Sequence, residues 1–360
     1  MRVRAATQNT RGVILAGQYA WKDSKFDALC PRPLLPVASR PLASYALLWL
    51  SEGGLHDVTV CANRDTRTVG DRLREYRPPD VDVELLEDPV PRGPAGCVRD
   101  AAGDAETLVV VGGTTVPLPD LGALLASHRA SGAAVTVVVH PEPGGDGAPK
   151  RHVPAGIYVF ERRALEHIPG HGFYDIKESL IPRLYREGER TTAYPVLDWS
   201  PRVLDAPSYL ELNAWMVERL CGGTPPDGFV RVSGILAHES ARIAADVACV
   251  GPVLVGAGAR VRAGATLVGP TSIGGASVVA EGALVSRSAV WSRCLVGEGA
   301  ATDGCILADG SMDAPGSRVF GDVLTAEPRR RPAALLPPRF RPSVPYHARP
   351  QRGPALGSTD

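Results

Sequence analysis

The residues best suited to chemistry lie in the segment Gly12–Val37, which reads GVILAGQYAWKDSKFDALCPRPLLPV. The apolar run 13–16 precedes Gly17 and predicts a buried parallel strand that opens into a loop. In open α/β sheets, nucleotides bind beside such a loop, where backbone N–H groups of glycine-rich turns hold phosphate. Residues 18–22 are Gln, Tyr, Ala, Trp and Lys instead of glycines. The sequence therefore predicts a phosphate-binding scaffold with altered chemistry.

This segment resembles the N-terminal signature of sugar-1-phosphate nucleotidyltransferases, LAGGxGTRLxPLTxxxPKPLLPV, and aligns with it without a gap. Lys22 falls on the catalytic Arg of the signature, and Arg32 falls on the Lys of its PKP motif. Lys in place of Arg loses the bidentate fork but keeps a point charge for phosphate. The resemblance implies catalytic roles for Lys22 and Arg32. It also implies a nucleotide site formed by Leu15, Ala16, Gly17 and Gln18.

Strand-like and helix-like runs alternate over residues 12–223, which predicts a Rossmann-like α/β domain with a mostly parallel sheet. A linker is expected at 224–228 (TPPDG). The expected strands are 58–62, 81–86, 108–111 and 134–139, and the expected helices are 41–53, 121–131 and 206–220.

A different periodicity begins after this linker, over residues 231–325. Aliphatic or small apolar residues recur every six positions, and the phase then slips by one, to Val290 and Val296. This period predicts a parallel β-helix of short strands and tight turns, and it resembles the left-handed hexapeptide-repeat helix. The repeating positions are Ile243, Cys249, Val255, Val261, Leu267, Ile273, Val279 and Val285.

The order of an α/β domain followed by a hexapeptide-repeat helix also resembles the architecture of GDP-mannose and dTDP-glucose pyrophosphorylases. The reaction that this resemblance implies is attack of a sugar-1-phosphate oxygen on the α-phosphate of a nucleoside triphosphate. It needs in-line positioning, charge neutralisation and Mg²⁺ held by carboxylates. The segment 93–96 (GPAG) resembles the family's GTAG, which packs against the nucleotide base. The implied base contacts are Gly93, Ala95 and Gly96.

The positions expected to hold the metal depart from the family pattern. Thr114 stands where an Asp should follow the strand 108–111, and a neutral hydroxyl is a poor ligand for a hard dication. The second Asp would belong to a W-x-D-x-G segment, and here Pro201 or Arg202 takes its place, depending on the anchor. Asp198 and Asp205 lie nearby as alternative ligands. No metal ligand is assigned, and Mg²⁺ is expected only if the chain is active.

The sugar-binding segment is also altered. The resemblance places a Glu-Lys-Pro motif before an Asn-Ala-Gly-Ile-Tyr strand, but only 141–153 precede the strand here, and they contain no Glu-Lys-Pro. The strand itself reads PAGIYVF, with Pro154 in place of Asn. By resemblance, Ala155 and Gly156 are the sugar-binding residues.

Composition sets limits on the remaining functions. The formal net charge is zero and 44% of residues are hydrophobic, so no global field favours nucleic acid or a membrane. Seven cysteines without a CxxC pair favour a reducing, cytoplasmic setting over a disulfide framework. Residues 326–360 are rich in Pro and Arg without periodicity, and are expected to form a disordered tail.

Three interpretations follow. In the first, the chain is a nucleotidyltransferase homologue with impaired catalysis, a regulatory or scaffolding subunit that binds a nucleotide or NDP-sugar. It would form a homo-oligomer or a hetero-oligomer with a catalytic relative. In the second, it is an active nucleotidyltransferase with Asp198 or Asp205 on the metal. In the third, it is a hexapeptide-repeat acyltransferase that uses His238. The remaining histidines considered are expected in loops: His128, His140, His152, His167 and His171.

Overall fold

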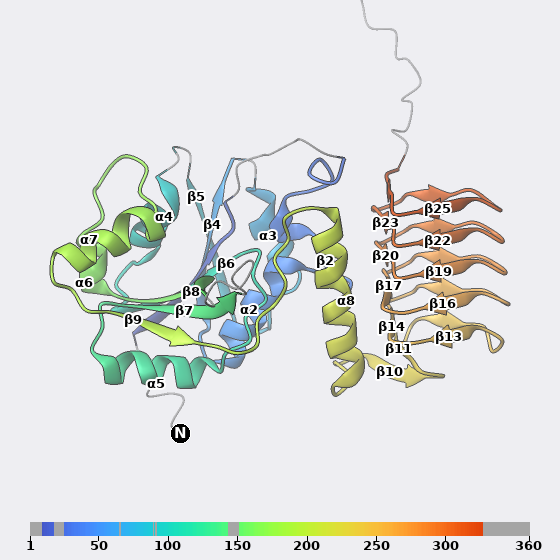
Figure 1. Ribbon diagram of the computed structural model, residues 1–360, viewed down its shortest axis with the longest axis horizontal. Coiled ribbons are helices and arrows are strands. Elements are labelled where there is room, and N and C mark those ends of the chain that lie inside the picture. The colour runs from blue at the N-terminus through green and yellow to red at the C-terminus, as the bar shows by residue number, and fades with distance from the viewer. Residues whose placement is uncertain are drawn as a thin grey trace, which may run out of the picture. The chain divides into compact units, whose positions relative to one another are not determined.

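The computed structural model describes residues 9–17, 25–64, 66–88, 90, 92–142 and 151–326. The chain through Ala326 forms one compact unit. Figure 1 shows its two architectures, an α/β sheet and a stack of short strands. Gln18 and Lys22 lie outside the described residues, as does the expected tail from residue 327 onward.

The N-terminal sheet has seven strands among the described residues, in the order β5-β4-β1-β6-β8-β7-β9. Strand β8 runs antiparallel to β6 and β7, and the remaining pairs are parallel. The predicted mostly parallel α/β sheet is therefore confirmed. Its strands are β1 (Thr10–Leu15), β4 (Asp57–Asn63), β5 (Asp82–Asp88), β6 (Thr107–Gly112), β7 (Val135–Glu142), β8 (Arg151–Glu161) and β9 (Thr191–Pro195).

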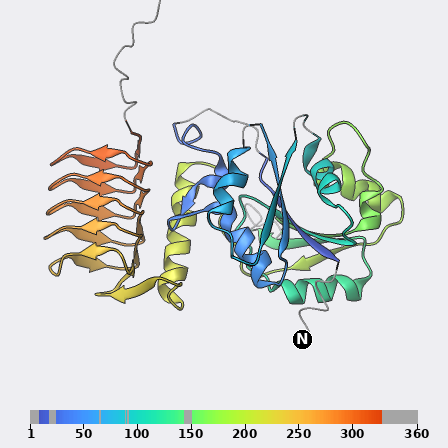
Figure 2. The same ribbon diagram turned by 180° about the vertical axis from the view of Figure 1, so that it is seen from behind.

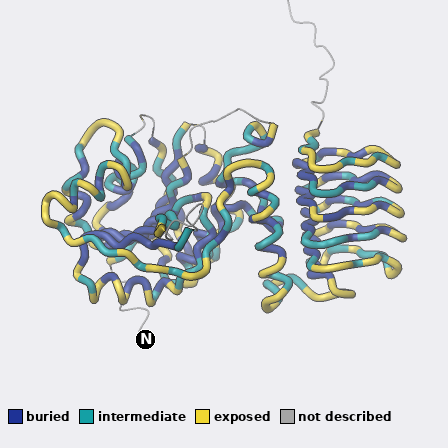
Figure 3. Tube along the Cα trace, viewed as in Figure 1, coloured by how far each residue is buried: buried dark blue, intermediate teal, exposed yellow. Residues whose placement is uncertain are grey.

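Helices cover both faces of this sheet because its central strands are apolar on both faces (Figures 2 and 3). In β6, Val109 and Val111 pack with α2, α3 and α5, whereas Leu108 and Val110 pack with α4, α6 and α7. The result is a three-layer sandwich. The helical segments are α2 (Leu42–Glu52), α3 (Thr68–Arg74), α4 (Gly93–Ala101), α5 (Leu121–Ser131), α6 (Arg162–Leu165), the π-helical turn η3 (Ile176–Leu180) and α7 (Ile181–Arg186).

Local sequence explains where several elements begin and end. The Asp120 carboxylate accepts the backbone N–H of Ala123 at 2.6 Å and caps α5, which ends at Gly132 with φ +62°. The helix predicted at 121–131 is confirmed. The proline-rich segment after Cys30 forms the 3₁₀ turn η1 (Arg32–Leu34) and a small hairpin of β2 (Pro36–Val37) and β3 (Arg40–Pro41).

Helix α8 (Ala206–Gly222) begins at a capping box. The Asp205 carboxylate accepts the Ser208 N–H, and the Ser208 hydroxyl accepts the Asp205 N–H. Its residues Tyr209 and Leu212 share one apolar core with Ile273 of the strand stack. The helix therefore joins the two architectures through packing as well as through the chain. No described helix is long and apolar enough to cross a lipid bilayer.

The stacked strands form the parallel β-helix that the six-residue period predicts. Val255 pairs with Ile273, 18 residues later, whereas Ile273 pairs with Val290, 17 residues later. The slip in the six-residue period therefore reflects a coil that is one residue shorter. The repeating residues from Val255 to Val285 are buried. Three sheets make up the stack: β11, β14, β17, β20, β23 and β26, with β10 antiparallel at the start; β12, β15, β18, β21 and β24; and β13, β16, β19, β22 and β25.

These strands are short. Their bounds are β10 (Phe229–Val232), β11 (Ile235–His238), β12 (Arg242–Ile243), β13 (Ala248–Val250), β14 (Val253–Val255), β15 (Arg260–Val261), β16 (Thr266–Val268), β17 (Thr271–Ile273), β18 (Val278–Val279), β19 (Leu284–Ser286), β20 (Ala289–Val290), β21 (Leu295–Val296), β22 (Ala301–Asp303), β23 (Ile306–Leu307), β24 (Met312–Asp313), β25 (Arg318–Phe320) and β26 (Val323–Leu324).

Candidate functional site

The carboxyl ends of β1 and β6 lie side by side, where an open α/β sheet binds ligands. Leu15 is the register partner of Gly112, and the N–H of Gly113 donates to the Leu15 carbonyl at 2.8 Å. Ala16 is buried and Gly17 is exposed. Leu15, Ala16 and Gly17 thus lie at the predicted strand end, but the loop that would contain Gln18 and Lys22 falls outside the described residues.

A cavity of about 400 Å³ opens beside these strand ends. It brings together four residues that the sequence singled out from distant segments: Arg32, Thr114, Ala155 and Gly156. The described lining does not include Leu15, Ala16 and Gly17, nor does it include Gly93, Ala95 and Gly96. The cavity therefore corresponds to the predicted sugar and metal region rather than to the predicted base region.

Arg32 is held on the wall of this cavity by protein groups. Its guanidinium forms an ion pair with Asp27 at 3.1 Å and donates to the carbonyls of Leu204 at 2.9 Å and Val203 at 3.4 Å. These contacts tie η1 to the segment that precedes α8. Arg32 lies on the cavity as expected, but its charge is already shared with Asp27, so a catalytic role for it stays a prediction.

Gly156 has a backbone conformation that a side chain would strain. Its φ is +81°, and a Cβ there would lie 2.8 Å from the Thr115 Oγ1. Thr115 in turn donates to the Ala155 carbonyl at 3.5 Å. The glycine is therefore required by the approach of Thr115, which packs β8 against the end of β6, and its predicted contact with sugar stays a prediction.

The positions expected to hold Mg²⁺ do not offer a metal's ligands. Thr114 is exposed at the end of β6, and Arg202 lines the same cavity. The carboxylate of Asp198 pairs with Arg219 at 3.1 Å, and that of Asp205 accepts the Ser208 N–H at 2.9 Å in the cap of α8. No group of three or more His, Cys, Asp or Glu side chains suited to a metal occurs among the described residues. A hydroxyl and a guanidinium do not fit a hard dication.

The predicted base-contacting turn forms the start of α4. Gly93 has φ +76°, and a Cβ there would lie 2.5 Å from the Tyr174 carbonyl oxygen. The same carbonyl accepts the N–H of Ala95 at 3.1 Å, and Gly96 is buried. The buried Asp88 accepts the N–H of Arg92 at 2.9 Å and fixes the entry to the helix. The glycines therefore accommodate the chain at Tyr174 in this structure, and their contact with a base stays a prediction.

Comparison with known proteins agrees with this geometry. Residues 11–148 match the family model described as nucleotidyl transferase. The N-terminal part of the chain is thus similar to nucleotidyl transferases, and its relatives support a sugar-1-phosphate nucleotidyltransferase family. A mannose-1-phosphate guanylyltransferase of Mycobacterium tuberculosis is 23% identical over 294 residues, which cover 70% of this chain and 77% of the relative.

The names of two further relatives of this nucleotidyltransferase homologue specify different nucleotides. A UTP–glucose-1-phosphate uridylyltransferase of Synechocystis is 21% identical and covers 87% of each chain. A mannose-1-phosphate guanyltransferase of Pichia angusta is 24% identical over 48% of this chain, which spans only 50% of that relative's length. The comparisons thus support the family, but they identify neither the base nor the sugar.

Two residues of the nucleotidyltransferase cavity were not predicted as functional. The His140 ring, on β7, stacks on the Trp199 ring with centroids 4.6 Å apart and an interplanar angle of 18°. Both residues line the cavity. His140 directly follows the apolar run 134–139, and this position at a strand's carboxyl end was the available signal. The expectation that His128, His140 and His152 lie in loops is wrong, because they lie on α5, β7 and β8.

A second cation, Lys177 on η3, lies close enough to Arg202 to be affected by its charge. Burial, together with the charge of Arg202, lowers the pKa of Lys177 on η3. Burial, together with the charge of Asp175, raises the pKa of Tyr158, and Arg202 opposes this change. The charges of Arg202 and Asp175 therefore both act on Lys177 and on Tyr158. The Asp175 carboxylate also accepts the N–H groups of Lys177 at 2.6 Å and Glu178 at 2.9 Å.

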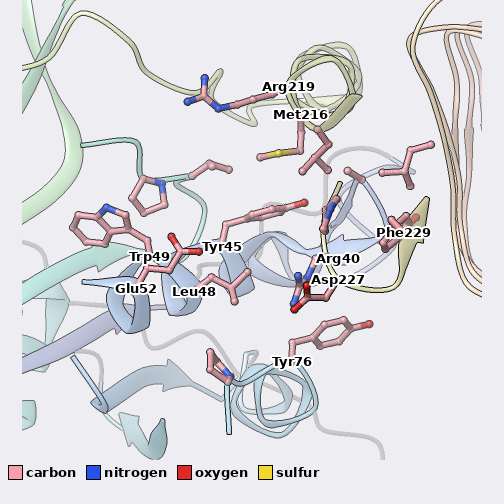
Figure 4. A pocket seen from close by; sticks show the side chains of 18 of the residues that line it. Arg40, Tyr45, Leu48, Trp49, Glu52, Tyr76, Met216, Arg219, Asp227 and Phe229 are labelled. Carbon is pink, nitrogen blue, oxygen red and sulfur yellow. The ribbon is translucent and has the colours of Figure 1, made fainter. Parts of the chain in front are cut away.

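A second cavity of about 1350 Å³ lies between α2, α8 and the first coil of the β-helix (Figure 4). The Arg40 guanidinium lies 5.9 Å from the centre of the Tyr76 ring, and the Trp49 Nε1–H donates to the Pro119 carbonyl at 2.6 Å. His238 also lines this cavity, and its Nδ1 contacts the Ser240 hydroxyl at 2.8 Å. The lining carries as many cationic as acidic side chains: Arg40, Arg77 and Arg219 against Glu52, Asp120 and Asp227. Charge alone therefore selects no ligand class for it.

Proposed function

We propose that this nucleotidyltransferase homologue binds a nucleotide sugar in the 400 Å³ cavity without synthesising one at an ordinary enzymatic rate, and acts as a ligand-responsive subunit. One observation carries the proposal. The first position where the family pattern calls for a metal-binding carboxylate holds Thr114, and the second holds Pro201 or Arg202, depending on the anchor; all three residues line the same cavity. Phosphoryl transfer of this class depends on a cation held by carboxylates to neutralise developing charge.

Two carboxylates were alternative ligands under the active interpretation, and their contacts weigh against it. Asp198 is engaged by Arg219, and Asp205 caps the first turn of α8. Moving either carboxylate onto a metal would break a contact that it makes in the folded chain. The retained apolar framework supports continued folding and ligand binding, because burial of apolar side chains rather than the metal site stabilises the fold.

The test is a pyrophosphate-release assay on the full chain with Mg²⁺. GTP, UTP, dTTP, ATP and CTP are each paired with mannose-1-phosphate and with glucose-1-phosphate. The mycobacterial guanylyltransferase, run in parallel with GTP and mannose-1-phosphate, checks the assay. We expect no release above background with any pair. Turnover of about 1 s⁻¹ or faster, within the usual enzymatic range, would overturn the proposal, and loss of that turnover in Asp198→Asn would identify Asp198 as a metal ligand.

Assembly is the second part of the proposal. The β-helix presents outward-facing apolar side chains at Val250, Met312 and Phe320, whose exposed fractions are 62%, 70% and 66%. Such exposure supports contact with another copy or with a catalytic relative. Light scattering after size-exclusion chromatography tests it. A monomer at every concentration would refute self-assembly, and co-purification with a catalytic relative then tests the hetero-oligomer.

A further inference from the structure

Arg202 lies on the wall of the 400 Å³ cavity and has no ion-pair partner among the described residues. It is exposed and lies in the same short segment as Trp199, between β9 and α8. Within the described part of the chain, no carboxylate lies within ion-pair distance of it. The two other arginines near this segment differ, because Arg32 pairs with Asp27 and Arg219 pairs with Asp198. The guanidinium of Arg202 therefore keeps all its donors available for a ligand.

A second cation lies close to Arg202. The charge of Arg202 contributes to lowering the pKa of Lys177, so the two like charges influence each other. The charge of Asp175 also acts on Lys177, and its carboxylate already accepts two backbone N–H groups at the start of η3. An anion in the cavity would relieve this repulsion.

The same charges disfavour a divalent cation. The Arg202 guanidinium repels a metal ion. Thr114 offers one neutral oxygen, whereas a carboxylate would be needed to offset the positive charge of the guanidinium and the metal. Arginine presents N–H donors in a rigid planar fork that matches phosphate oxygens. The Arg202 guanidinium can thus neutralise a phosphate that relatives of this fold would present to a metal.

We propose that Arg202 takes the place of the divalent cation, so that the cavity binds the diphosphate of a nucleotide sugar without metal. The class of ligand rests on the proposed function given above. The inference adds the means of binding, which is a side-chain charge in place of a bound ion, and a consequence, which is that affinity does not depend on Mg²⁺.

The rest of the cavity suits the sugar end of such a ligand. The stacked pair His140 and Trp199 gives a flat aromatic wall, against which the apolar face of a sugar ring can pack. Ala155 and Gly156 line the same cavity and leave space because their side chains are small or absent. A volume of about 400 Å³ lies in the usual range for small-molecule sites.

The experiment is isothermal titration calorimetry on the full chain with GDP-mannose, UDP-glucose and dTDP-glucose as probes. Each titration is run once with Mg²⁺ and once with EDTA. We expect at least one probe to bind, with a Kd that agrees within about twofold between the two conditions. Arg202→Ala should weaken this binding roughly tenfold to a hundredfold, since a charge-assisted contact is lost. Arg202→Lys should recover part of the affinity, because a point charge remains.

A matched control is Arg260→Ala, which removes an exposed arginine from the β-helix strand β15 and should leave the Kd unchanged. Thermal unfolding of each variant checks that it folds. A wild-type Kd that weakens tenfold or more in EDTA would overturn the inference, as would normal affinity in a folded Arg202→Ala variant. Failure of all three probes to bind would also overturn it.

These outcomes separate the inference from the proposed function. Metal-free binding together with measurable pyrophosphate release would refute the impaired-catalysis proposal and leave the role of Arg202 standing. Metal-dependent binding without turnover would refute the role of Arg202 alone. Arg202→Asp gives a further check, because a carboxylate there should weaken binding in EDTA more than alanine does.

Discussion

Tyr209 on α8 connects three segments of the chain through one buried hydroxyl. The Trp291 Nε1–H, from the β-helix, donates to the Tyr209 Oη at 2.7 Å, and that hydroxyl donates to the Pro36 carbonyl of β2. Tyr209 and Trp291 are 0% and 5% exposed, and their rings meet edge to face. The segment that carries Arg32 is thus fastened to both α8 and the β-helix.

We predict that Tyr209→Phe destabilises the protein by about 1–3 kcal/mol, because it leaves the buried Trp291 N–H and the partly buried Pro36 carbonyl without the hydroxyl that they contact. Urea unfolding followed by tryptophan fluorescence measures the change. Tyr185→Phe is the control, since Tyr185 is 78% exposed and its loss should change the unfolding free energy by less than about 0.5 kcal/mol. Equal stability of the two variants would show that the Tyr209 hydroxyl contributes nothing.

Thr114→Asp alone should not create metal-dependent activity. The new carboxylate would face the cavity that Arg202 also lines, and it would pair with a cation instead of gathering further oxygen ligands. The pyrophosphate-release assay described above tests this prediction. Appearance of Mg²⁺-dependent turnover in the single variant would show that one missing carboxylate is the whole defect.

Gly156→Ala should destabilise the fold by at least about 1–2 kcal/mol, because its positive φ strains a side chain and its Cβ would meet Thr115. Gly170→Ala is the matched control, since a Cβ there has no neighbour within 4 Å. We expect the control to stay within about 0.5 kcal/mol of the wild type in the same unfolding experiment. If both variants behave alike, the backbone at Gly156 is not strained by a side chain.

His128 should make stability depend on pH. Its Nε2 lies 2.9 Å from the Glu161 carboxylate and its Nδ1 lies 2.7 Å from the Thr136 hydroxyl. Because a carboxylate accepts, Nε2 carries the proton, and in the neutral ring Nδ1 accepts from Thr136. Burial lowers the pKa of His128 from 6.5, and this effect outweighs the attraction of Glu161. Because the folded pKa lies below the unfolded pKa, the unfolded state binds more protons between them. The stabilisation is therefore complete above about pH 6.5 and is lost as the pH falls toward the folded value.

The measurement compares urea unfolding of the wild type and His128→Gln at about pH 7.5 and about pH 5.5. Carboxylates other than Glu161 contribute equally to both proteins, so the difference isolates His128 together with its contact to Glu161. The wild type should lose up to about 1 kcal/mol more than the variant over this interval. An identical pH dependence in the two proteins would mean that His128 does not titrate differently on folding.

Local periodicity was sufficient to predict both architectures, the α/β sheet and the β-helix. The apolar run 108–111 is buried on both faces of its strand, which is why it lacks the alternation of a half-exposed strand and was identifiable as part of a parallel sheet. The six-residue period from Val255 to Val285 follows the inward side of each coil, and even the slip at Val290 marks a coil of 17 residues. The two ends of α5 also follow from local sequence, because Asp120 caps its start and Gly132 ends it.

The sequence by itself determined these elements, together with the loss of a carboxylate at Thr114, because each depends on neighbours along the chain. Only the tertiary structure decided which side chains meet. It stacked His140 on Trp199, paired Arg32 with Asp27, and placed Arg202 on the same cavity without an ion-pair partner in the described part of the chain. Arg202 and Thr114 come from segments far apart in sequence, and their shared cavity results from the packing of β6, β8 and the chain before α8. No local period encodes that meeting, because it depends on how remote elements bury their apolar faces together.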